Sequence, residues 1–596
     1  MNIIADKLKK TFAARDRADF LALSALVLIF TALAFFRLGN TYAPQSYYTT
    51  DTSNRDIVLD FGDYVDLSSF SVFLGNLNTR HFSLSAFNEV TGAWEIINGE
   101  AVAESVFAWN QIDLNYRLRY LGIVVTDDES MINEIVIKHM DGSVILPVNY
   151  EEYPTLFDEQ ELFPDARTYM TGTMFDEVYH GRTAYEFLHG LPAYETTHPH
   201  FGKILISLGI LLFGMTPFGW RFMPVMFGIA IIPLMYFFAR KLFKEPFIAA
   251  ATTALLVFDC MHYNLSRIAT IDIFAAFFIL MMYYYMFRYF QKDSAYRCGL
   301  LAGHNITPVI PSSSSGKSAS AGSFCALSDK FPPTEVYTPL ALSGISMAFA
   351  IATKWTGVYA GAGLAVLFIW YTLTHFPKKQ TLRLFLFCCL FFVAIPLIIY
   401  TLCFIPVVGY TQYDNLIDKT IQGTLSMFDY HYNLEAEHYY SSPFYEWPVI
   451  WMPLLDANDI VSADKVSSVS CMGNPVIWWT GIPCVLYVLF SWIFKKDKKA
   501  GFLVIAYLAQ YVPWMPIKRI TFIYHYFPAI LFVILMMGYT MADIRKRFLW
   551  GKKAITFYLV TAVICFFLFF PVVSGLPVPQ EYGLRLRWLK EWILVL

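Results

Sequence analysis

The sequence has 596 residues, of which 56% are hydrophobic, 18% are aromatic and only 15% are charged. About 25% of the residues of a typical soluble domain are charged, so this composition excludes an ordinary soluble protein. It predicts a polytopic membrane protein with some mass outside the bilayer. The net charge of −3 and the lack of a clustered basic and aromatic surface do not indicate nucleic-acid binding.

Residues 1–19 are basic and lead into an apolar run over residues 20–36. Residues 37–40 read Arg-Leu-Gly-Asn and lack the small-residue pattern of a cleavage site. We therefore expect an uncleaved signal anchor, with residues 1–42 forming a cytoplasmic N-terminus and the first transmembrane helix.

Residues 41–200 are acidic, because they contain 25 Asp and Glu but only 7 Lys and Arg. Within them, residues 43–150 show short alternating strands, turn signals such as Asp141-Gly142 and no helical periodicity. These patterns predict an independent extracytoplasmic β-sandwich. Its aromatic order resembles that of discoidin-like, galactose-binding jelly rolls and runs Phe82, Trp94, Phe107, Trp109 and Tyr120. We favour core positions over sugar binding for its Trp residues.

The rest of the chain contains apolar windows long enough to cross about 30 Å of hydrocarbon. Together with the N-terminal run they begin near Phe20, Trp220, Phe247, Ile268, Pro339, Gly357, Leu384, Val476, Gly501, Phe522 and Ala554. The windows near Phe247 and Pro339 are short or interrupted. We expect about 11 transmembrane helices, in a core over residues 220–405 and a four-helix C-terminal region over residues 476–596.

Basic residues in the connecting loops predict the orientation of the chain. If the N-terminus is inside, alternation of the spans places every basic loop cluster inside, as the positive-inside rule requires. These clusters lie at residues 240–244, 288–330, 378–379, 495–499 and 545–553. The acidic block, which continues as an outer loop over residues 151–219, then lies outside, together with the loop over residues 406–475 and the C-terminal tail.

One inner loop, residues 303–334, is of low complexity, and we expect it to be disordered. It contains Gly316-Lys317-Ser318, which is similar to the end of a phosphate-binding loop. No glycine stands five residues before Gly316 and no strand precedes it, so we do not assign nucleotide binding to it.

The most informative segment reads Phe-Asp-Glu-Val-Tyr-His over residues 175–180. Its adjacent carboxylates, Asp176 and Glu177, precede a long series of apolar spans. Ionisable groups beside a membrane are expensive to hold there and indicate a functional site. The alternative is the first turn of a solvated helix, because acidic residues favour that end of the helix dipole.

Further polar side chains lie at the same predicted outer ends of the spans. Arg and Lys there attract anionic head groups, and a nearby carboxylate can act as a general base. This combination suits transfer from a lipid phosphate to a hydroxyl acceptor, with the cations stabilising the leaving phosphate. The candidate substrate-binding residues are His198, Lys203, Arg221, Arg267, Asp272, Lys354, Arg519 and His525. Arg221 has a second interpretation, as a topology anchor.

A metal site is not expected. His198 and His200 have a spacing that permits zinc binding, but no third or fourth ligand is spaced to complete a site. Asn264-Leu265-Ser266 matches a glycosylation sequon, which we discount because it adjoins a membrane end.

The order of these motifs resembles the protein O-mannosyltransferase family, membrane glycosyltransferases with the C-superfamily fold. The resemblance covers residues 175 to about 575. Its strongest parts are Phe175-Asp176-Glu177, Thr197-His198-Pro199, Gly202-Lys203, Ser266-Arg267, Asp272, Thr353-Lys354-Trp355-Thr356-Gly357, the segments 431–448 and 473–479, Arg519 and Tyr524-His525-Tyr526-Phe527-Pro528.

The resemblance implies mannose transfer from a polyprenyl-phosphate (dolichyl-type) carrier to Ser or Thr of a protein, with inversion at the sugar carbon. It implies that Asp176 is the base and that Glu177 supports the site. Arg267, Lys354 and Arg519 are candidates to bind the carrier phosphate. It implies no metal or other cofactor.

Two departures from the family pattern bear on location and specificity. His200 and Phe201 stand where the family has Pro and Leu, which bears on acceptor choice. The loop over residues 406–475 is too short for the sugar-binding-type repeat domain of eukaryotic members. The arrangement resembles bacterial members, so we expect a bacterial plasma membrane rather than the endoplasmic reticulum, with the active site extracytoplasmic.

Three other functions are compatible with parts of the sequence. A sister enzyme of the same fold that glycosylates a lipid or cell-wall polymer is poorly separated from the first hypothesis. A transporter predicts paired hydropathy repeats and a polar site at the membrane midplane, neither of which the sequence has. A glycan-binding module on an anchor does not need about 11 spans.

Overall fold

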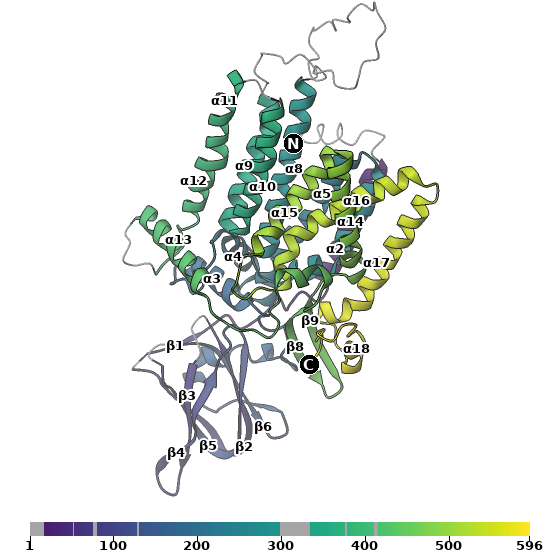
Figure 1. Cartoon of the computed structure of the whole chain (residues 1–596). Coiled ribbons are helices and arrows are strands. Elements are labelled where there is room, and N and C mark those ends of the chain that lie inside the picture. The colour runs from purple at the N-terminus through teal and green to yellow at the C-terminus, as the bar shows by residue number, and fades with distance from the viewer. Residues whose placement is uncertain are drawn as a thin grey trace, which may run out of the picture.

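The computed structural model describes residues 17–51, 53–75, 80–127, 130–297, 334–375, 378–409 and 415–596. Most of the basic N-terminal segment and nearly all of the loop predicted to be disordered, residues 303–333, lie outside the described residues. A helical bundle forms one part of the molecule, and a β-sheet domain projects from one end of it (Figure 1).

Nine helices in the described part of the chain are long and apolar enough to cross a membrane. They are α2 (Arg17–Phe35), α5 (Pro217–Phe243), α8 (Asp272–Arg297), α9 (Thr334–Thr353), α10 (Thr356–His375), the span Leu382–Leu402, α14 (Pro475–Lys495), α16 (Phe527–Arg547) and α17 (Gly551–Ser574). The span Leu382–Leu402 joins α11 (Lys378–Cys389) to α12 (Ile395–Leu402) through a π-turn over Leu390–Ala394. The chain is therefore a multi-pass α-helical membrane protein.

The two remaining apolar windows form shorter helices. α6 (Pro246–Val257) has 12 residues and α15 (Lys498–Tyr511) has 14 residues. At about 1.5 Å per residue neither is long enough to cross the hydrocarbon alone. α6 is followed by α7 (Cys260–Leu265), and α15 by the 3-10 turn Val512–Trp514. The count of about 11 spans thus stays a prediction.

Local sequence signals explain where several helices begin. Thr216 caps α5, its hydroxyl accepting from the Gly219 amide at 3.0 Å, and Pro217 takes the first helical position. Asn474 caps α14 in the same manner, and its side-chain amide donates to the carbonyls of Phe258 and Ala562, each at 2.9 Å. The start of α14 is thereby tied to the end of α6 and to α17.

The β domain is a single seven-stranded antiparallel sheet. Its strands are β1 (Tyr48–Thr50), β2 (Asp56–Leu74), β3 (Arg80–Asn88), β4 (Ala93–Ala103), β5 (Trp109–Val125), β6 (Ser130–His139) and β7 (Val144–Ile145). Their order is β1-β6-β2-β5-β3-β4, with β7 paired to β6. Hydrogen bonds join all the strands of the predicted β-sandwich into one sheet, whose long strands β2 and β5 shift register near residues 60–65 and 67–69.

A closed core explains the folding of this domain. Alternate residues of the long strands, such as Leu59, Phe70 and Ile123, are fully buried. Leu156 and Phe157 join the same core, so its packing extends beyond the predicted boundary at residue 150. Of its two predicted core tryptophans, Trp109 is buried against Phe73 and Phe163, whereas Trp94 on the edge strand is 44% exposed.

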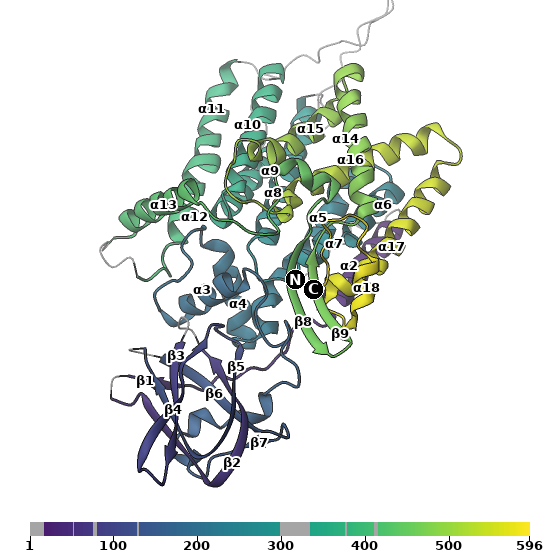
Figure 2. The same cartoon turned by 60° about the horizontal axis from the view of Figure 1, so that its bottom comes forward.

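Several smaller elements complete the structure, and of these α3 (Glu177–His189) and α4 (Phe201–Phe213) lie between the bundle and the β domain (Figure 2). The others are α13 (Leu416–Asn433), α18 (Gln580–Arg585), 3-10 turns at Tyr150–Glu152, Pro154–Leu156, Gln160–Leu162, Phe444–Val449 and Ile523–Tyr526, and a sheet of β8 (Leu454–Ser462), β9 (Lys465–Cys471) and β10 (Val578–Pro579). The sequence analysis did not predict α13 or this small sheet.

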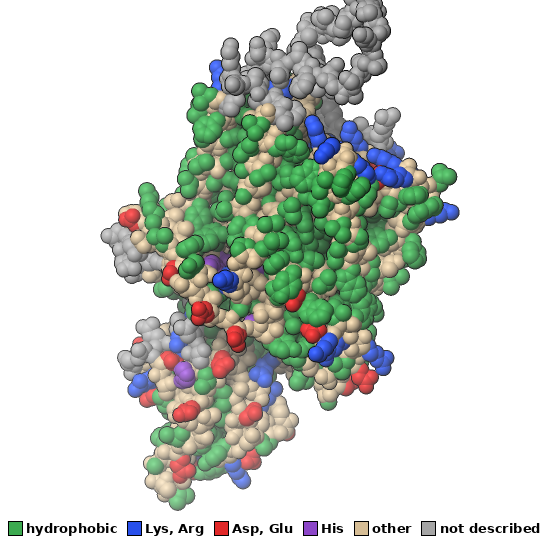
Figure 3. All heavy atoms as spheres, viewed as in Figure 1, with side chains coloured by type: hydrophobic (Ala, Val, Ile, Leu, Met, Phe, Trp, Pro, Cys, Tyr) green, Lys and Arg blue, Asp and Glu red, His purple; other side chains and the backbone are tan. Residues whose placement is uncertain are grey.

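Basic residues gather at the end of the bundle away from the β domain. Figure 3 shows Lys and Arg side chains along this edge, above a broad hydrophobic band, and acidic side chains on the β domain. Contacts confirm that helix ends from distant segments meet at the basic edge. Lys499 donates to the Leu242 carbonyl at 2.8 Å, and Arg545 lies 3.5 Å from Glu245.

Candidate active site

Asp176 occupies the turn that precedes α3. The preceding residue, Phe175, has a φ of 41°, a left-handed conformation that is strained for a residue with a side chain. Its ring packs edge-on against Phe522 and Tyr524, at centroid distances of 5.8 and 6.2 Å. These contacts hold the turn, which leaves the Asp176 carboxylate with no hydrogen-bond partner in the described part of the chain.

The surroundings of Asp176 favour proton uptake near neutral pH. Burial raises the pKa of Asp176 to about 7, against the opposing effect of the Lys354 ammonium. The carboxylates of Asp272 and Glu195 raise this pKa further. A carboxylate with such a pKa is suited to act as a general base at neutral pH.

Glu177, the next residue, is held in a buried ion pair with Arg221. Arg221 Nε and Nη2 donate to the two Glu177 oxygens at 2.8 and 2.6 Å, and both side chains are fully buried. The Trp220 indole and the Ala269 amide also donate to this carboxylate, at 3.2 and 2.9 Å. Glu177 is thus fixed by its partners, whereas the adjacent Asp176 carboxylate has no hydrogen-bond partner among the described residues.

Arg221 uses its remaining donors inside the protein. It donates to the carbonyls of Leu38, Tyr169 and Gly172 at 2.8 to 2.9 Å. All five of its N–H groups therefore have acceptors, and none points toward a bound substrate. Arg221, which belongs to α5, instead connects this helix to the residues that follow α2 and to the segment that precedes Asp176.

Arg267 makes a similar connection between the first and last spans. Its guanidinium donates to the carbonyl of Ala34 in the last turn of α2, to those of Phe36 and Arg37 just after it, and to that of Ser574 at the end of α17. The Tyr169 hydroxyl lies 2.9 Å from the carbonyl oxygens of both Arg37 and Ser574, which share its single proton as acceptors. Arg267 is buried in this junction and does not line the cleft described next.

A cleft of about 1090 Å³ has Lys354, the ion-pair partner of Asp272, in its wall. It is lined by His198, Pro199, Lys354, Trp355, Thr356, Tyr359, Phe428, His431, Tyr432, Asn433, Leu434, Glu435, Ala436, Trp514, Pro516, Ile517, Lys518, Arg519 and Ile520. Of the predicted substrate-binding residues, His198, Lys354 and Arg519 line it. Asp272 lies just behind, accepting from Lys354 Nζ at 2.7 Å.

The cations of the cleft differ in their partners. Lys354 is paired with Asp272 and lies 5.3 Å from the centre of the Tyr524 ring. Arg519 makes one hydrogen bond within the described residues, to the Ile520 carbonyl at 3.4 Å, so most of its donors are available to an anion. Lys518, which the sequence analysis did not single out, is an exposed neighbour on the same wall.

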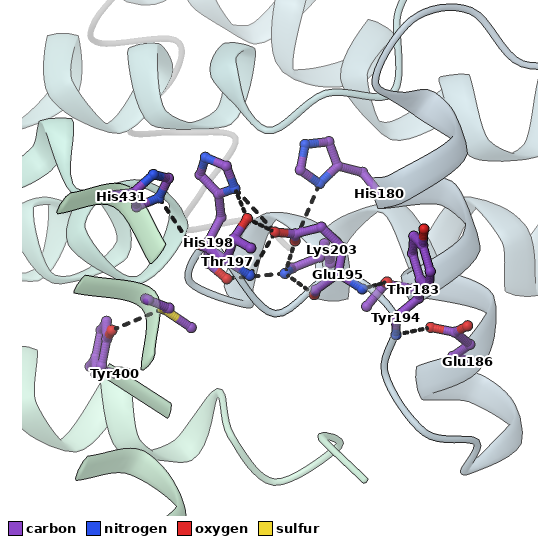
Figure 4. A network of polar contacts seen from close by, with 11 residues as sticks. His180, Thr183, Glu186, Tyr194, Glu195, Thr197, His198, Lys203, Tyr400 and His431 are labelled. Atoms are coloured by element: carbon purple, nitrogen blue, oxygen red, sulfur yellow. Dashed lines mark hydrogen bonds and ion pairs between the residues drawn. The ribbon is translucent and has the colours of Figure 1, made fainter. Parts of the chain in front are cut away.

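A compact polar network holds His198 at the cleft (Figure 4). Glu195 accepts from Lys203, from the Thr197 amide at 2.8 Å and from His198 Nδ1 at 3.1 Å. Although burial opposes ionisation, Lys203 and His198 hold the pKa of Glu195 well below its usual range. Lys203 is fully buried and also donates to the Glu195 and His198 carbonyls at 2.8 and 3.0 Å. It shapes the loop and does not reach the cleft.

His431, from α13, completes this wall. Its Nε2 donates to the Thr197 carbonyl at 2.9 Å, and its ring centre lies 4.9 Å from that of His198. Burial lowers the pKa of His431 to about 3, so its imidazole is neutral. His431 belongs to a motif recognised in the sequence, but its spacing from the other residues gave no indication that it meets His198.

Two further histidines are packed inside the protein. His525 lies among aromatic rings, 4.5 Å from Trp514 and 6.0 Å from Trp447 between ring centres. His200 is fully buried against Phe404 and Phe187. His200 and His198 therefore lie in different environments, in spite of their spacing of two residues.

Two models of known protein families match parts of the chain. A sequence model described as dolichyl-phosphate-mannose-protein mannosyltransferase matches residues 213–306. A second, described as the C-terminal four-transmembrane region of protein O-mannosyltransferase, matches residues 416–592.

Curated relatives carry related names. The chain is 23% identical to a polyprenol-phosphate-mannose–protein mannosyltransferase of Mycobacterium tuberculosis over 474 residues, which is 70% of this chain and 86% of that protein. It is 24% identical to the protein of that name from Corynebacterium glutamicum, over 66% of this chain and 81% of that protein.

A solved structure has the same fold. The Saccharomyces cerevisiae protein O-mannosyltransferase Pmt1–Pmt2 complex, bound to its sugar donor, superposes with a TM-score of 0.56 and 14% identity. The match covers 70% of this chain and 89% of that chain. The chain therefore shares the fold of that complex.

The different roles of the two adjacent carboxylates predict different effects of mutation. Glu177→Gln leaves the Arg221 charge unpaired in the core, which typically costs about 3–5 kcal/mol, so we expect a large fall in the thermal midpoint of the protein in nanodiscs. Asp176→Asn breaks no hydrogen bond and is the matched control, expected to unfold at the wild-type temperature. Equal unfolding temperatures for both variants would contradict the anchoring role of Glu177.

Proposed function

Because the chain belongs to the protein O-mannosyltransferase family, we propose that it transfers mannose from a polyprenyl-phosphate carrier to Ser and Thr hydroxyls of proteins. The observation that carries this proposal is the Asp176 carboxylate, which has no hydrogen-bond partner among the described residues and interacts electrostatically with Lys354. Asp176 does not itself line the cleft, whereas Lys354 and Arg519 do. The names of the bacterial relatives, which match most of this chain, support the same donor and acceptor.

In the proposed reaction, Asp176 takes the proton of the acceptor hydroxyl as the hydroxyl oxygen attacks the anomeric carbon of mannose. The new bond joins that oxygen to the sugar, and the bond between the sugar and the carrier phosphate breaks. Attack from the side opposite the phosphate inverts the anomeric carbon. The polyprenyl phosphate leaves with the negative charge, and the proton remains on Asp176.

Arg519 and Lys354 are the proposed ligands of the carrier phosphate. Arg519 has free donors, and a guanidinium binds phosphate through a planar fork. Lys354 stands between the Asp272 carboxylate and the cleft. The donors of Arg221 and most of those of Arg267 are used by carbonyls and carboxylates of the protein. We therefore assign both residues, with Lys203, to positioning the site and not to binding the donor.

The proposed location is the extracytoplasmic face of a bacterial plasma membrane. The basic ends of α5, α14 and α16 lie away from the cleft, which supports a cytoplasmic position for that end of the bundle under the positive-inside rule. Nucleotide sugars are not made outside the cytoplasm. A sugar donor that is linked to a lipid can instead reach an extracytoplasmic cleft through the bilayer, which fits the proposed location. The similarity to mycobacterial and corynebacterial proteins supports a bacterial membrane.

The main alternative is a transferase of the same fold that glycosylates a lipid or a cell-wall polymer. A transporter is less well supported, because the titratable groups of the cleft gather at one end of the bundle and not at its midplane.

The transfer itself is tested with membranes that contain the protein and radiolabelled polyprenyl-phosphate mannose. We expect label in protein, released by β-elimination, and a loss of roughly 10²–10⁴-fold in rate for Asp176→Asn. Label found only in lipid or glycan would reject the protein acceptor. Near-normal turnover of Asp176→Asn would reject Asp176 as the base.

The charges around Asp176 predict a characteristic pH dependence. Because the base must be deprotonated, kcat/KM should rise with pH and reach half its maximum near pH 7, the pKa of Asp176. Lys354→Met removes a cation that favours the carboxylate, so the midpoint should move up. Asp272→Asn removes a repelling negative charge, so the midpoint should move down.

Both variants break the ion pair between Lys354 and Asp272. A loss of rate common to both variants is therefore explained by the broken pair, whereas shifts of the pH midpoint in opposite directions are explained by the opposite charges removed. Shifts in the same direction would contradict the electrostatic role assigned to these two residues.

Arg519 should contribute to donor binding. Hydrogen bonds to charged groups are worth about 1.5–3 kcal/mol, so we expect Arg519→Ala to lower kcat/KM for the lipid donor by about 10- to 100-fold. Arg519→Lys should recover part of the loss, because it keeps the charge but not the fork. Lys465→Ala, at an exposed position of the β8–β9 hairpin, is the control. Unchanged donor kinetics in Arg519→Ala would remove it from the phosphate site.

A further inference from the structure

Helix α13 has an apolar face that no described part of the chain covers. Ile417, Ile421, Leu425, Phe428 and Tyr432 follow one another at helical spacing, and each is at least 50% exposed. Scattered exposed apolar residues are ordinary, but a continuous stripe marks an interaction surface. We call these five residues the α13 stripe.

The other faces of α13 have different surroundings. Thr420, Gly423 and Met427 are buried, and Met427 packs with Phe404 and Val407 in a small apolar cluster. A third, polar face carries exposed Asp418, Gln422, Ser426 and Asp429. The helix thus has one side on the protein, one polar side and one exposed apolar side, as helices that lie in a membrane interface do.

The α13 stripe continues the lipid-facing surface of the preceding span. α12 and the turn after it expose Leu397, Ile398, Leu402 and Ile405, each at least 50% exposed. α13 lies across the end of α12 and does not extend it (Figures 1 and 2). Lys419 fixes this crossing by donating to the Val407 carbonyl at 2.8 Å, and Thr424 Oγ1 lies 3.3 Å from the Tyr400 hydroxyl.

We propose that α13 lies in the lipid interface on the cleft side of the membrane, with the α13 stripe in the acyl-chain boundary, and forms the lateral entrance to the cleft. The proposed contact of the α13 stripe is the lipid bilayer, because the stripe adjoins the exposed apolar surface of a membrane span. The stripe contains no charged residue, and its tyrosine is of the type that is enriched at the membrane–water boundary.

The entrance role rests on the proposed function and on two shared residues. Phe428 and Tyr432 belong to the stripe and also line the cleft, on the same helix as His431. A lipid-linked sugar keeps its chain in the bilayer while its phosphate lies at the interface. A helix with its apolar face at that depth and its C-terminal end at the cleft therefore borders the path from the bilayer to Arg519.

Photo-crosslinking tests the position of α13 without any need for turnover. Benzoylphenylalanine replaces Ile421 or Leu425 on the stripe, or Gln422 or Ser426 on the polar face, in protein held in nanodiscs of phosphatidylethanolamine and phosphatidylglycerol. We expect lipid adducts by mass spectrometry from the first pair and none from the second. Equal adducts from both pairs, absence of lipid adducts, or crosslinked dimers from the stripe would overturn the proposal.

Donor kinetics test the entrance. Ile421→Asp and Leu425→Asp place a charge in the interface and should raise KM for polyprenyl-phosphate mannose several-fold with kcat retained, whereas Gln422→Asp should not. Unchanged KM in the stripe variants would overturn the entrance role. Lipid adducts at the stripe in a protein that transfers no mannose would refute the proposed function and leave the position of α13 intact.

Discussion

The buried ion pair between Glu177 and Arg221 is the interaction on which the site depends. Both charges are withdrawn from water, which is tolerable only because every donor of the guanidinium and both carboxylate oxygens have partners. Those partners come from the exit of α2, from the segment before α3, from α5 and from the start of the segment that leads into α8. The pair therefore fixes the turn that carries Asp176. It holds the Glu177 carboxylate rigidly, while the adjacent Asp176 carboxylate remains free to exchange a proton.

The same principle separates the cations of the site into two groups. Lys203, Arg221 and Arg267 lie where water is excluded, and their donors are directed to carbonyls and carboxylates that shape the loops. Arg519 and Lys518 lie on the wall of an open cleft, where Lys518 is exposed and Arg519 is partly exposed, so an unmatched positive charge carries no large desolvation penalty. Lys354 stands at the boundary, sharing its charge between Asp272 and the space beside Asp176. The proposed division into structural and ligand-binding cations thus follows from burial, and not from residue type.

Much of the architecture could be predicted from the sequence, because hydrocarbon imposes long apolar runs and a half-buried sheet imposes alternation. The gathering of Asp176, His198, Lys354 and Arg519 at one end followed from the order of spans and motifs. The sequence could not distinguish the environment of Arg221 from that of Arg519, since both are arginines at predicted span ends. Only the tertiary structure shows that every hydrogen-bond donor of Arg221 has an acceptor within the protein. The β8–β9 hairpin was missed because it is short and enclosed in a loop. α13 was missed although its apolar residues recur at helical spacing, because they are interspersed with polar residues and form no continuous apolar run of the kind that marks a membrane span.

The junction of Tyr169, Arg267 and Ser574 has a consequence for biogenesis. Two donors that brace the exit of the first span, the Tyr169 hydroxyl and the Arg267 guanidinium, share the carbonyl of Ser574, which is the last residue of α17. The ribosome must synthesise the whole of α17 before that carbonyl exists. The growing polypeptide therefore cannot complete this junction until α17 has been synthesised, and a product truncated before α17 leaves the Tyr169 hydroxyl and Arg267 Nη1 without this buried acceptor.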